Sequence, residues 1–188
     1  MNATSAFRGR ENRVEKRSIL VWDLPTRAFH WLLALSFVGA FLTAESERYR
    51  DVHVMLGYTM LGLVAFRVVW GLIGTRYARF WSFAFGPRSV LTYLKSLFTR
   101  SPQHYLGHNP AGSWAIYALL ASSVLAGASG YATYNDVGGH WMEDAHEALA
   151  NMLLGLVFVH LAGVLVSSIR HRENLVRSML TGYKSGRP

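Results

Sequence analysis

The sequence predicts an all-α integral membrane protein, a bundle of four transmembrane helices. Four apolar stretches, residues 25–43, 53–73, 113–134 and 145–169, have roughly the 20-residue length with which a helix crosses a hydrocarbon core. None alternates polar and apolar residues as a strand would. The chain of 188 residues is 51% hydrophobic and only 16% charged, whereas soluble domains average about a quarter charged residues. This composition favours a single membrane domain.

The expected ends of these helices carry typical start and stop residues. Pro25 suits the first turn of the first span, and Ser113, shortly after Pro110, is the expected N-cap of the third. Gly74 ends the second span, and the pair 138–139, both glycine, breaks the chain after the third. The four stretches are therefore separate helices.

The basic residues predict the orientation of the bundle. Of the 19 Lys and Arg, all but Arg48 and Arg50 lie near the N-terminus, around the 74–112 connection, or near the C-terminus. Four spans place these three regions on one side, which the positive-inside rule assigns to the cytoplasm, together with both termini. Seven of the 11 acidic residues lie at the opposite face: Glu45, Glu47, Asp51, Asp136, Glu143, Asp144 and Glu147. The net charge of +8 thus fits membrane lipid as a partner and needs no nucleic acid.

The chain divides into three parts on this interpretation. Residues 1–18 form a basic cytoplasmic tail, 19–175 the four-helix transmembrane domain, and 176–188 a cytoplasmic C-terminal tail. Within the domain, residues 88–100 have one apolar face and are expected to form a short cytoplasmic interfacial helix. A plain polar connector is the alternative.

Four histidines at membrane depth are the main functional signal, because ionisable groups in spans are costly and usually functional. His30 lies near the cytoplasmic end of the first span, and His53 at the outer end of the second. His146 lies at the outer end of the fourth span and His160 deeper in it, 14 residues later. That spacing is nearly four helical turns, so both rings share one face, about 21 Å apart along the axis.

Matching these depths predicts two pairs, His53–His146 outside and His30–His160 inside, each holding one haem iron. The chain has no cysteine, which excludes covalent haem attachment and iron–sulfur clusters. Two imidazoles give a six-coordinate iron suited to one-electron transfer. The alternative is a proton relay through the histidines, but the middles of the spans lack the carboxylates that such a relay normally includes.

Other residues have weaker signals. Arg27 and Arg67 lie on the same helix faces as His30 and His53 and are candidates to pair with haem propionates or a quinone oxygen; snorkelling to lipid phosphate is the alternative. Small residues in the spans either leave space for a haem or allow close helix packing; these are Gly57, Gly155 and Gly163. The remaining histidines, expected to be solvated or interfacial, are His104, His108, His140 and His171.

Several segments together resemble the bacterial cytochrome b561 family, which includes the b-type cytochrome subunits of nickel–iron hydrogenases. Residues 21–31 read Val-Trp-Asp-Leu-Pro-Thr-Arg-Ala-Phe-His-Trp, and residues 53–58 read His-Val-Met-Leu-Gly-Tyr. His146 with His160, followed by segment 167–176, completes the resemblance, which covers about residues 19–184. It implies b-type haem, the bacterial inner membrane and quinone-linked electron transfer, and it carries ligand roles onto the same four histidines. The third span carries little of the family signature.

Two functions are compatible with this pattern. The first is an electron conduit with two b-type haems, which exchanges electrons between quinone, its expected substrate, and a periplasmic redox protein such as a c-type cytochrome or a hydrogenase. The second is a haem-bearing anchor subunit of a larger complex, such as a hydrogenase, without catalysis of its own. Quinone oxidoreductase activity and a homodimer stay open, and a haem-free transporter or sensor is a third, less favoured reading.

Overall fold

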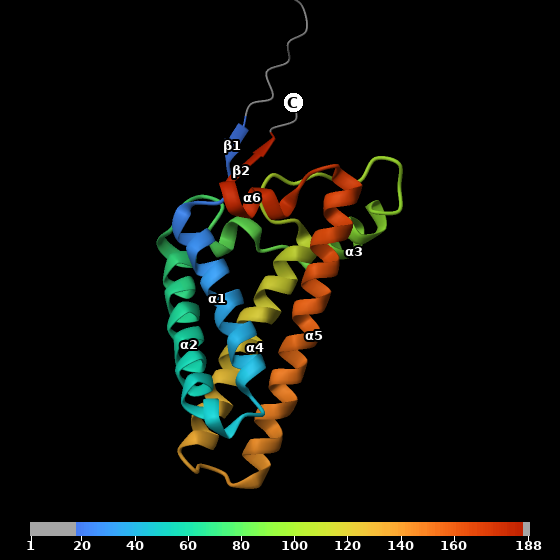
Figure 1. Cartoon of the computed structure of the whole chain (residues 1–188). Coiled ribbons are helices and arrows are strands. Elements are labelled where there is room, and N and C mark those ends of the chain that lie inside the picture. Colours follow the sequence, from blue (N-terminus) through green and yellow to red (C-terminus); the bar gives the residue numbers. More distant parts are fainter. Residues whose placement is uncertain (1–17, 186–188) are drawn as a thin grey trace, which may run out of the picture.

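Four long helices form the body of the molecule in a computed structural model that describes residues 18–185 (Figure 1). They are α1 (Leu24–Thr43), α2 (Arg50–Ile73), α4 (Pro110–Tyr134) and α5 (His140–His171). All four are long and apolar enough to cross a membrane. Helix α1 packs against α2, α2 against α4, and α4 against α5. The predicted four-helix membrane bundle is therefore confirmed.

The outer surface of the bundle is apolar, as expected where lipid replaces water. Only 11–22% of the residues in the most apolar window of each span are buried inside the protein. Large side chains such as Leu42 on α1, Ile73 on α2 and Phe158 on α5 are mostly exposed. Because these side chains face hydrocarbon, the internal packing has to supply specificity rather than the hydrophobic driving force.

One buried apolar cluster touches every span. It consists of Ala40 of α1, Met60 of α2, Ala126 of α4 and Leu153 of α5. Leu153 lies seven residues from both His146 and His160, which places it on the face of α5 that carries them. Its apolar side chain therefore lies between the levels of these two histidines.

The helix starts agree with expectation in α1 and differ in α4. Asp23 is the N-cap of α1, with Pro25 in its first turn. Helix α4 begins at Pro110, three residues before the expected cap Ser113, and its N-cap is Asn109. The Asn109 side chain accepts a hydrogen bond from the Gly112 N–H at 2.7 Å, and Pro110 needs no partner because it lacks an N–H.

Short elements gather at one end of the bundle, opposite the α1–α2 and α4–α5 loops (Figure 1). They are β1 (Ser18–Leu20), η2 (Phe80–Phe83), α3 (Pro87–Ser96), α6 (Leu175–Thr181) and β2 (Tyr183–Ser185), whereas η1 (Glu47–Tyr49) lies in the α1–α2 loop. Helix α3 confirms that the segment expected to form an interfacial helix is helical. The predicted basic tail lies, apart from Ser18, outside the described residues, as do residues 186–188.

The C-terminal segment, expected to be a tail, folds back onto the start of α1. Strand β2 pairs antiparallel with β1, so that Leu20 faces Tyr183. Gly182, at φ 89°, makes the turn between α6 and β2, and its carbonyl accepts hydrogen bonds from the N–H groups of Val21 and Trp22. Strands of three residues are too short to show an alternating pattern, so the sequence did not predict them.

Asp23 also connects the ends of α1 and α2. Its carboxylate accepts hydrogen bonds from the Thr26 N–H at 2.9 Å, the Trp70 indole at 3.0 Å and the Thr75 hydroxyl at 2.7 Å. Burial alone would raise the pKa of Asp23, but these hydrogen bonds outweigh it and lower the pKa below its ordinary value. The charged form is therefore favoured by the folded state.

We expect Asp23→Ala to destabilise the folded protein by about 1–2 kcal/mol at neutral pH, because it removes a helix cap and two tertiary hydrogen bonds. Since the pKa of Asp23 is lowered on folding, this contribution is complete above pH 4–5 and fades as the pH falls through the folded-state value. Thermal unfolding in detergent at several pH values measures it. Asp144→Ala, at an exposed carboxylate of α5, is the control and should have little effect; equal losses in both variants would contradict the proposed role.

Candidate functional site

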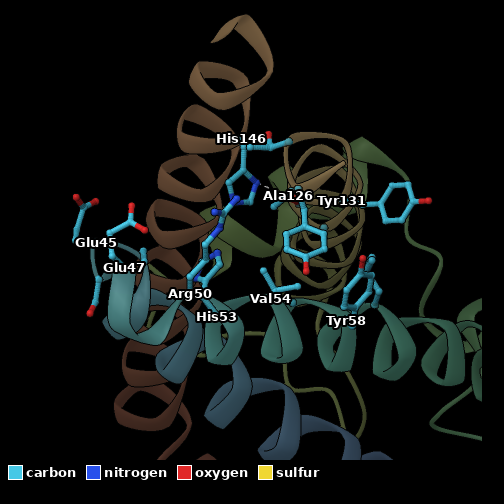
Figure 2. Close-up of a pocket in the computed structure, with 17 residues that line it drawn as sticks. Glu45, Glu47, Arg50, His53, Val54, Tyr58, Ala126, Tyr131 and His146 are labelled. Carbon is cyan, nitrogen blue, oxygen red and sulfur yellow. Dashed lines mark hydrogen bonds between the residues drawn. The ribbon is translucent and has the colours of Figure 1, made fainter. Parts of the chain in front are cut away.

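Two histidines face each other across a cavity at the outer end of the bundle. His53 projects from α2 and His146 from α5 (Figure 2), and their ring centres are 6.1 Å apart. The cavity has a volume of about 360 Å³ and is also lined by Arg50, Gly57 and Gly130. The structure thus brings together the pair that the sequence predicted for the outer side.

Hydrogen bonds determine which ring nitrogens of this pair are free. The Nδ1 of His53 lies 2.8 Å from the Ala40 carbonyl oxygen, and the Nδ1 of His146 lies 3.0 Å from that of Ala126. A carbonyl oxygen can only accept, so each Nδ1 carries the proton. The Nε2 of each ring keeps its lone pair, which is the form in which histidine binds a metal.

Small residues make room for His146 and for the cavity. Ser129 of α4 adds a contact at 3.1 Å between its hydroxyl oxygen and the His146 Nδ1. A Cβ atom on Gly130 would lie only 2.9 Å from Cε1 of the same ring, whereas a Cβ on Gly57 would meet nothing within 4 Å. Gly130 is therefore needed to seat His146, and Gly57 borders open space. Gly155 is 9 residues from His146 and so lies on the opposite face of α5, where it gives no clearance.

The second pair lies in the inner half of the bundle. His30 of α1 and His160 of α5 have ring centres 6.4 Å apart, and both rings are partly buried. The Nδ1 of His30 is buried without a hydrogen-bond partner among the described residues. Because a buried polar nitrogen without a partner is costly, a group other than these protein atoms has to meet this one.

The distance between the ring centres in each pair fits b-type haem. Two imidazoles that bind one iron from opposite sides, each at about 2 Å, have ring centres about 6 Å apart. No cluster of three His, Cys, Asp or Glu that could hold a bare ion occurs among residues 18–185, so a porphyrin would have to supply the remaining ligands. Within the same residues α5 packs closely on α4 rather than on α1 or α2, and the outer cavity lies between α2, α4 and His146 of α5.

The two arginines that the sequence singled out both lie at the inner end. Arg67 is only 3% exposed; its Nη2 donates to the Ala78 carbonyl at 3.0 Å, while its Nη1 is buried without a partner. Arg27 donates to the Leu180 carbonyl of α6, and its Nε is likewise buried and unpartnered. Arg67 therefore does not snorkel toward lipid.

The remaining histidines differ from one another. His140 is fully solvated, as expected. His104 is paired with Glu173 at 3.0 Å. His171 is buried, with its Nε2 3.5 Å from the Tyr93 hydroxyl. The expectation of a solvated or interfacial position is therefore wrong for His171.

His108 also departs from expectation, because its ring lies between those of Trp22 and Phe83, with ring centres 4.6 and 4.3 Å away and the planes tilted. Burial, followed by the nearby Arg67, Lys184 and His160, lowers the pKa of His108 to about 3, so this side chain is neutral at physiological pH.

Four participants escaped sequence reasoning: Arg50, Ser129, Gly130 and Lys184. Arg50 was counted only as a loop charge, although it lies at the start of α2 and lines the outer cavity (Figure 2). Ser129 and Gly130 belong to the third span, and no sequence spacing links them to His146. Lys184 reaches the inner end only through the β1–β2 pairing, which the sequence did not indicate.

Comparisons with known proteins agree with this geometry. The family model described as prokaryotic cytochrome b561 matches residues 21–182. A probable Ni/Fe-hydrogenase B-type cytochrome subunit of Rhizobium leguminosarum bv. viciae is 24% identical over 92% of this chain and 91% of its own. The corresponding protein of Azotobacter vinelandii is 24% identical over 94% and 92%, and the probable Ni/Fe-hydrogenase 1 B-type cytochrome subunit of Escherichia coli (strain K12) is 23% identical over 88% and 90%. No solved structure matches the chain significantly.

Gly130→Ala should weaken haem binding at the outer pair about tenfold or more, the range seen when the surroundings of a metal-binding histidine are altered. The added methyl group would push the His146 ring away from His53. The haem-to-protein ratio and the reduced-minus-oxidised spectrum of the purified protein measure the loss. Gly62→Ala is the matched control, since a Cβ there meets nothing within 4 Å; normal haem content in Gly130→Ala would show that the ring has room to move.

Proposed function

Because this chain belongs to the prokaryotic cytochrome b561 family, we propose that it conducts electrons across the bacterial inner membrane between the quinone pool and a periplasmic redox partner, using two b-type haems. Membership of the family makes it a multi-pass membrane protein that binds b-type haem and transfers electrons. The two haems, their ligands and the reaction partners are the proposed part.

One observation carries the proposal: two histidine pairs at different depths, each at the spacing of a shared iron. The rings are 6.1 Å apart in the outer pair and 6.4 Å in the inner pair. Each pair joins α5 to a different partner helix, α2 outside and α1 inside. A chain with a single haem would need only one such pair.

The protein's own residues would perform defined tasks at these sites. A b-type haem held by these histidines would supply one-electron transfer. His53 and His146 present Nε2 because their Nδ1 protons are held by backbone carbonyls. Along α5, the buried apolar side chain of Leu153 lies between the levels of His146 and His160.

The two ends suit different partners. All seven acidic residues of the outer loops, Glu45, Glu47, Asp51, Asp136, Glu143, Asp144 and Glu147, are exposed. Such a surface favours approach of a protein with a basic patch in a salt-dependent manner. The opposite end carries the basic residues of α3, α6 and the 74–109 connection, which supports its placement, and that of both termini, in the cytoplasm. We place the quinone site at this inner end, beside Trp22 and Arg27.

Haem stoichiometry tests the ligand assignment. The purified protein should contain two haems per chain, and His146→Ala and His160→Ala should each contain one, because each removes an axial ligand of a different iron. Pyridine haemochrome analysis against protein concentration measures this ratio. His140→Ala, at a solvated histidine, should keep both; two haems in both ligand variants would refute the assignment.

The names of the relatives favour a second function, that of the membrane cytochrome subunit of a hydrogenase. All three relatives described above are named as such subunits and are matched over most of their length. Here the partner would perform catalysis, and this chain would accept its electrons and anchor it to the membrane.

Turnover by the isolated protein separates these functions. If the conduit proposal is correct, a short-chain quinol analogue should reduce the haems of the purified protein fast enough to sustain turnover. A subunit that depends on its partner would hold the same haems but would be reduced by the quinol only when a hydrogenase is bound.

A further inference from the structure

The inner end of the bundle holds more buried positive charge than its carboxylates can offset. Arg67 is 3% and Lys184 is 8% exposed. Among the described residues neither forms an ion pair, since the salt bridges found there involve only His104 and His140. Asp23 influences Arg67 and Glu173 influences Lys184 from a distance. The oxygens of Asp23 already accept from Thr26, Trp70 and Thr75, and Glu173 is paired with His104. Buried cations without a counter-charge are strongly disfavoured.

Aromatic rings connect these cations to His108. The Lys184 ammonium lies 5.6 Å from the centre of the Trp22 ring, and the Trp22 ring contacts that of His108 in a tilted arrangement. On the other side of His108, Phe83 contacts Phe80 at 5.9 Å, over which the Arg67 guanidinium lies at 4.7 Å. The three nitrogen-bearing groups therefore border one continuous aromatic surface, drawn from segments far apart in the sequence.

The same groups have hydrogen-bonding capacity that the protein does not use. The Arg67 Nη1 and the His108 Nδ1 are buried without partners among residues 18–185. The Lys184 ammonium has only a long contact, 3.5 Å, to the Gly107 carbonyl. Trp22, which contacts His108, donates to the Ser178 hydroxyl, and Trp31 donates to the adjacent Met179 carbonyl. The Trp31 ring contacts that of His30 at 5.1 Å, so this donor cluster lies at the same end of the bundle as His30. Its chemistry is that of a site for carboxylate groups.

We propose that Arg67, His108 and Lys184 bind the propionate carboxylates of the haem held by His30 and His160. This inference rests on the proposed function, because it requires a haem at the inner pair. Two propionates would offset the two buried cations, whereas a quinone carbonyl is neutral and would leave them uncompensated.

Lys184 gives this site an unexpected link to the C-terminus. It lies in β2, whose pairing with β1 and approach to Trp22 hold its ammonium at the inner end. The C-terminal strand is thus a structural part of the haem site, and occupancy of the site would in turn favour the β1–β2 pairing by binding linkage.

Redox titration of the Lys184→Gln variant tests the proposal. A nearby cation favours the reduced haem, so its loss should lower the reduction potential of the inner haem. We expect the equilibrium constant for its reduction to fall by about threefold to tenfold, which corresponds to a shift of up to about 59 mV for one electron. The outer haem should be unchanged. A His146→Ala background, which retains only the inner haem, assigns the signals. Lys95→Gln is the matched control, since Lys95 is exposed on α3 at the same end.

Two further measurements separate propionate binding from a structural role. Lys184→Arg should restore the inner potential, because it keeps the charge. The propionate bending band in the resonance Raman spectrum should shift in Lys184→Gln and in His108→Phe, a variant that retains the ring packing between Trp22 and Phe83. Both variants should be compared as purified, haem-containing protein.

The possible failures are distinguishable. If the protein contains no inner haem, the proposed function fails before these variants are compared. If two haems are present but Lys184→Gln shifts neither the inner potential nor the Raman band, the propionate site is wrong. A loss confined to binding of a quinone analogue would assign the cluster to quinone instead and would also overturn the proposal.

Discussion

The arrangement of the bundle depends on how imidazole nitrogens are satisfied where no water is available. A ring nitrogen within a span must bond to backbone, side chain or metal, because hydrocarbon offers nothing. In the outer pair the carbonyls of Ala40 and Ala126 bind the two Nδ1 atoms. Neither carbonyl requires a polar side chain, so the spans remain apolar. Each imidazole is thereby fixed in orientation and tautomer, with its second nitrogen left free.

Helix α5 is the longest helix and has the smallest buried share of the four spans. It carries one member of each histidine pair, so the proposed haems require a space between it and both α1 and α2. Its close packing is confined to α4. There Gly130 allows His146 to approach within a distance that any Cβ would block. Helix α4, which contributes no histidine to either pair, therefore sets the position of α5, which contributes one histidine to each.

The sequence predicted the parts of this structure that depend on periodicity and depth. Span length gave four helices, and the 14-residue interval between His146 and His160 placed both rings on one face. Parts that depend on tertiary approach were not predictable. Ser129 and Gly130 act on a residue in another helix, and nothing in their local sequence distinguishes them from packing residues of a membrane span. The start of α4 was misjudged because Asn109 precedes a proline that is itself a favourable first helical residue.

Arg67 shows how a charge can be correctly counted and still be misread. Its side chain was expected either to reach lipid phosphate or to face the haem, and both alternatives are compatible with the positive-inside rule. At 3% exposure, stacked over Phe80 and bonded to the Ala78 carbonyl, it cannot contact lipid headgroups. Lys184 is buried in the same way. The proposed orientation rests on the exposed cations, such as Arg88 and Lys95, while the buried ones are available for an internal anion. Only the tertiary structure separates these two groups of basic residues.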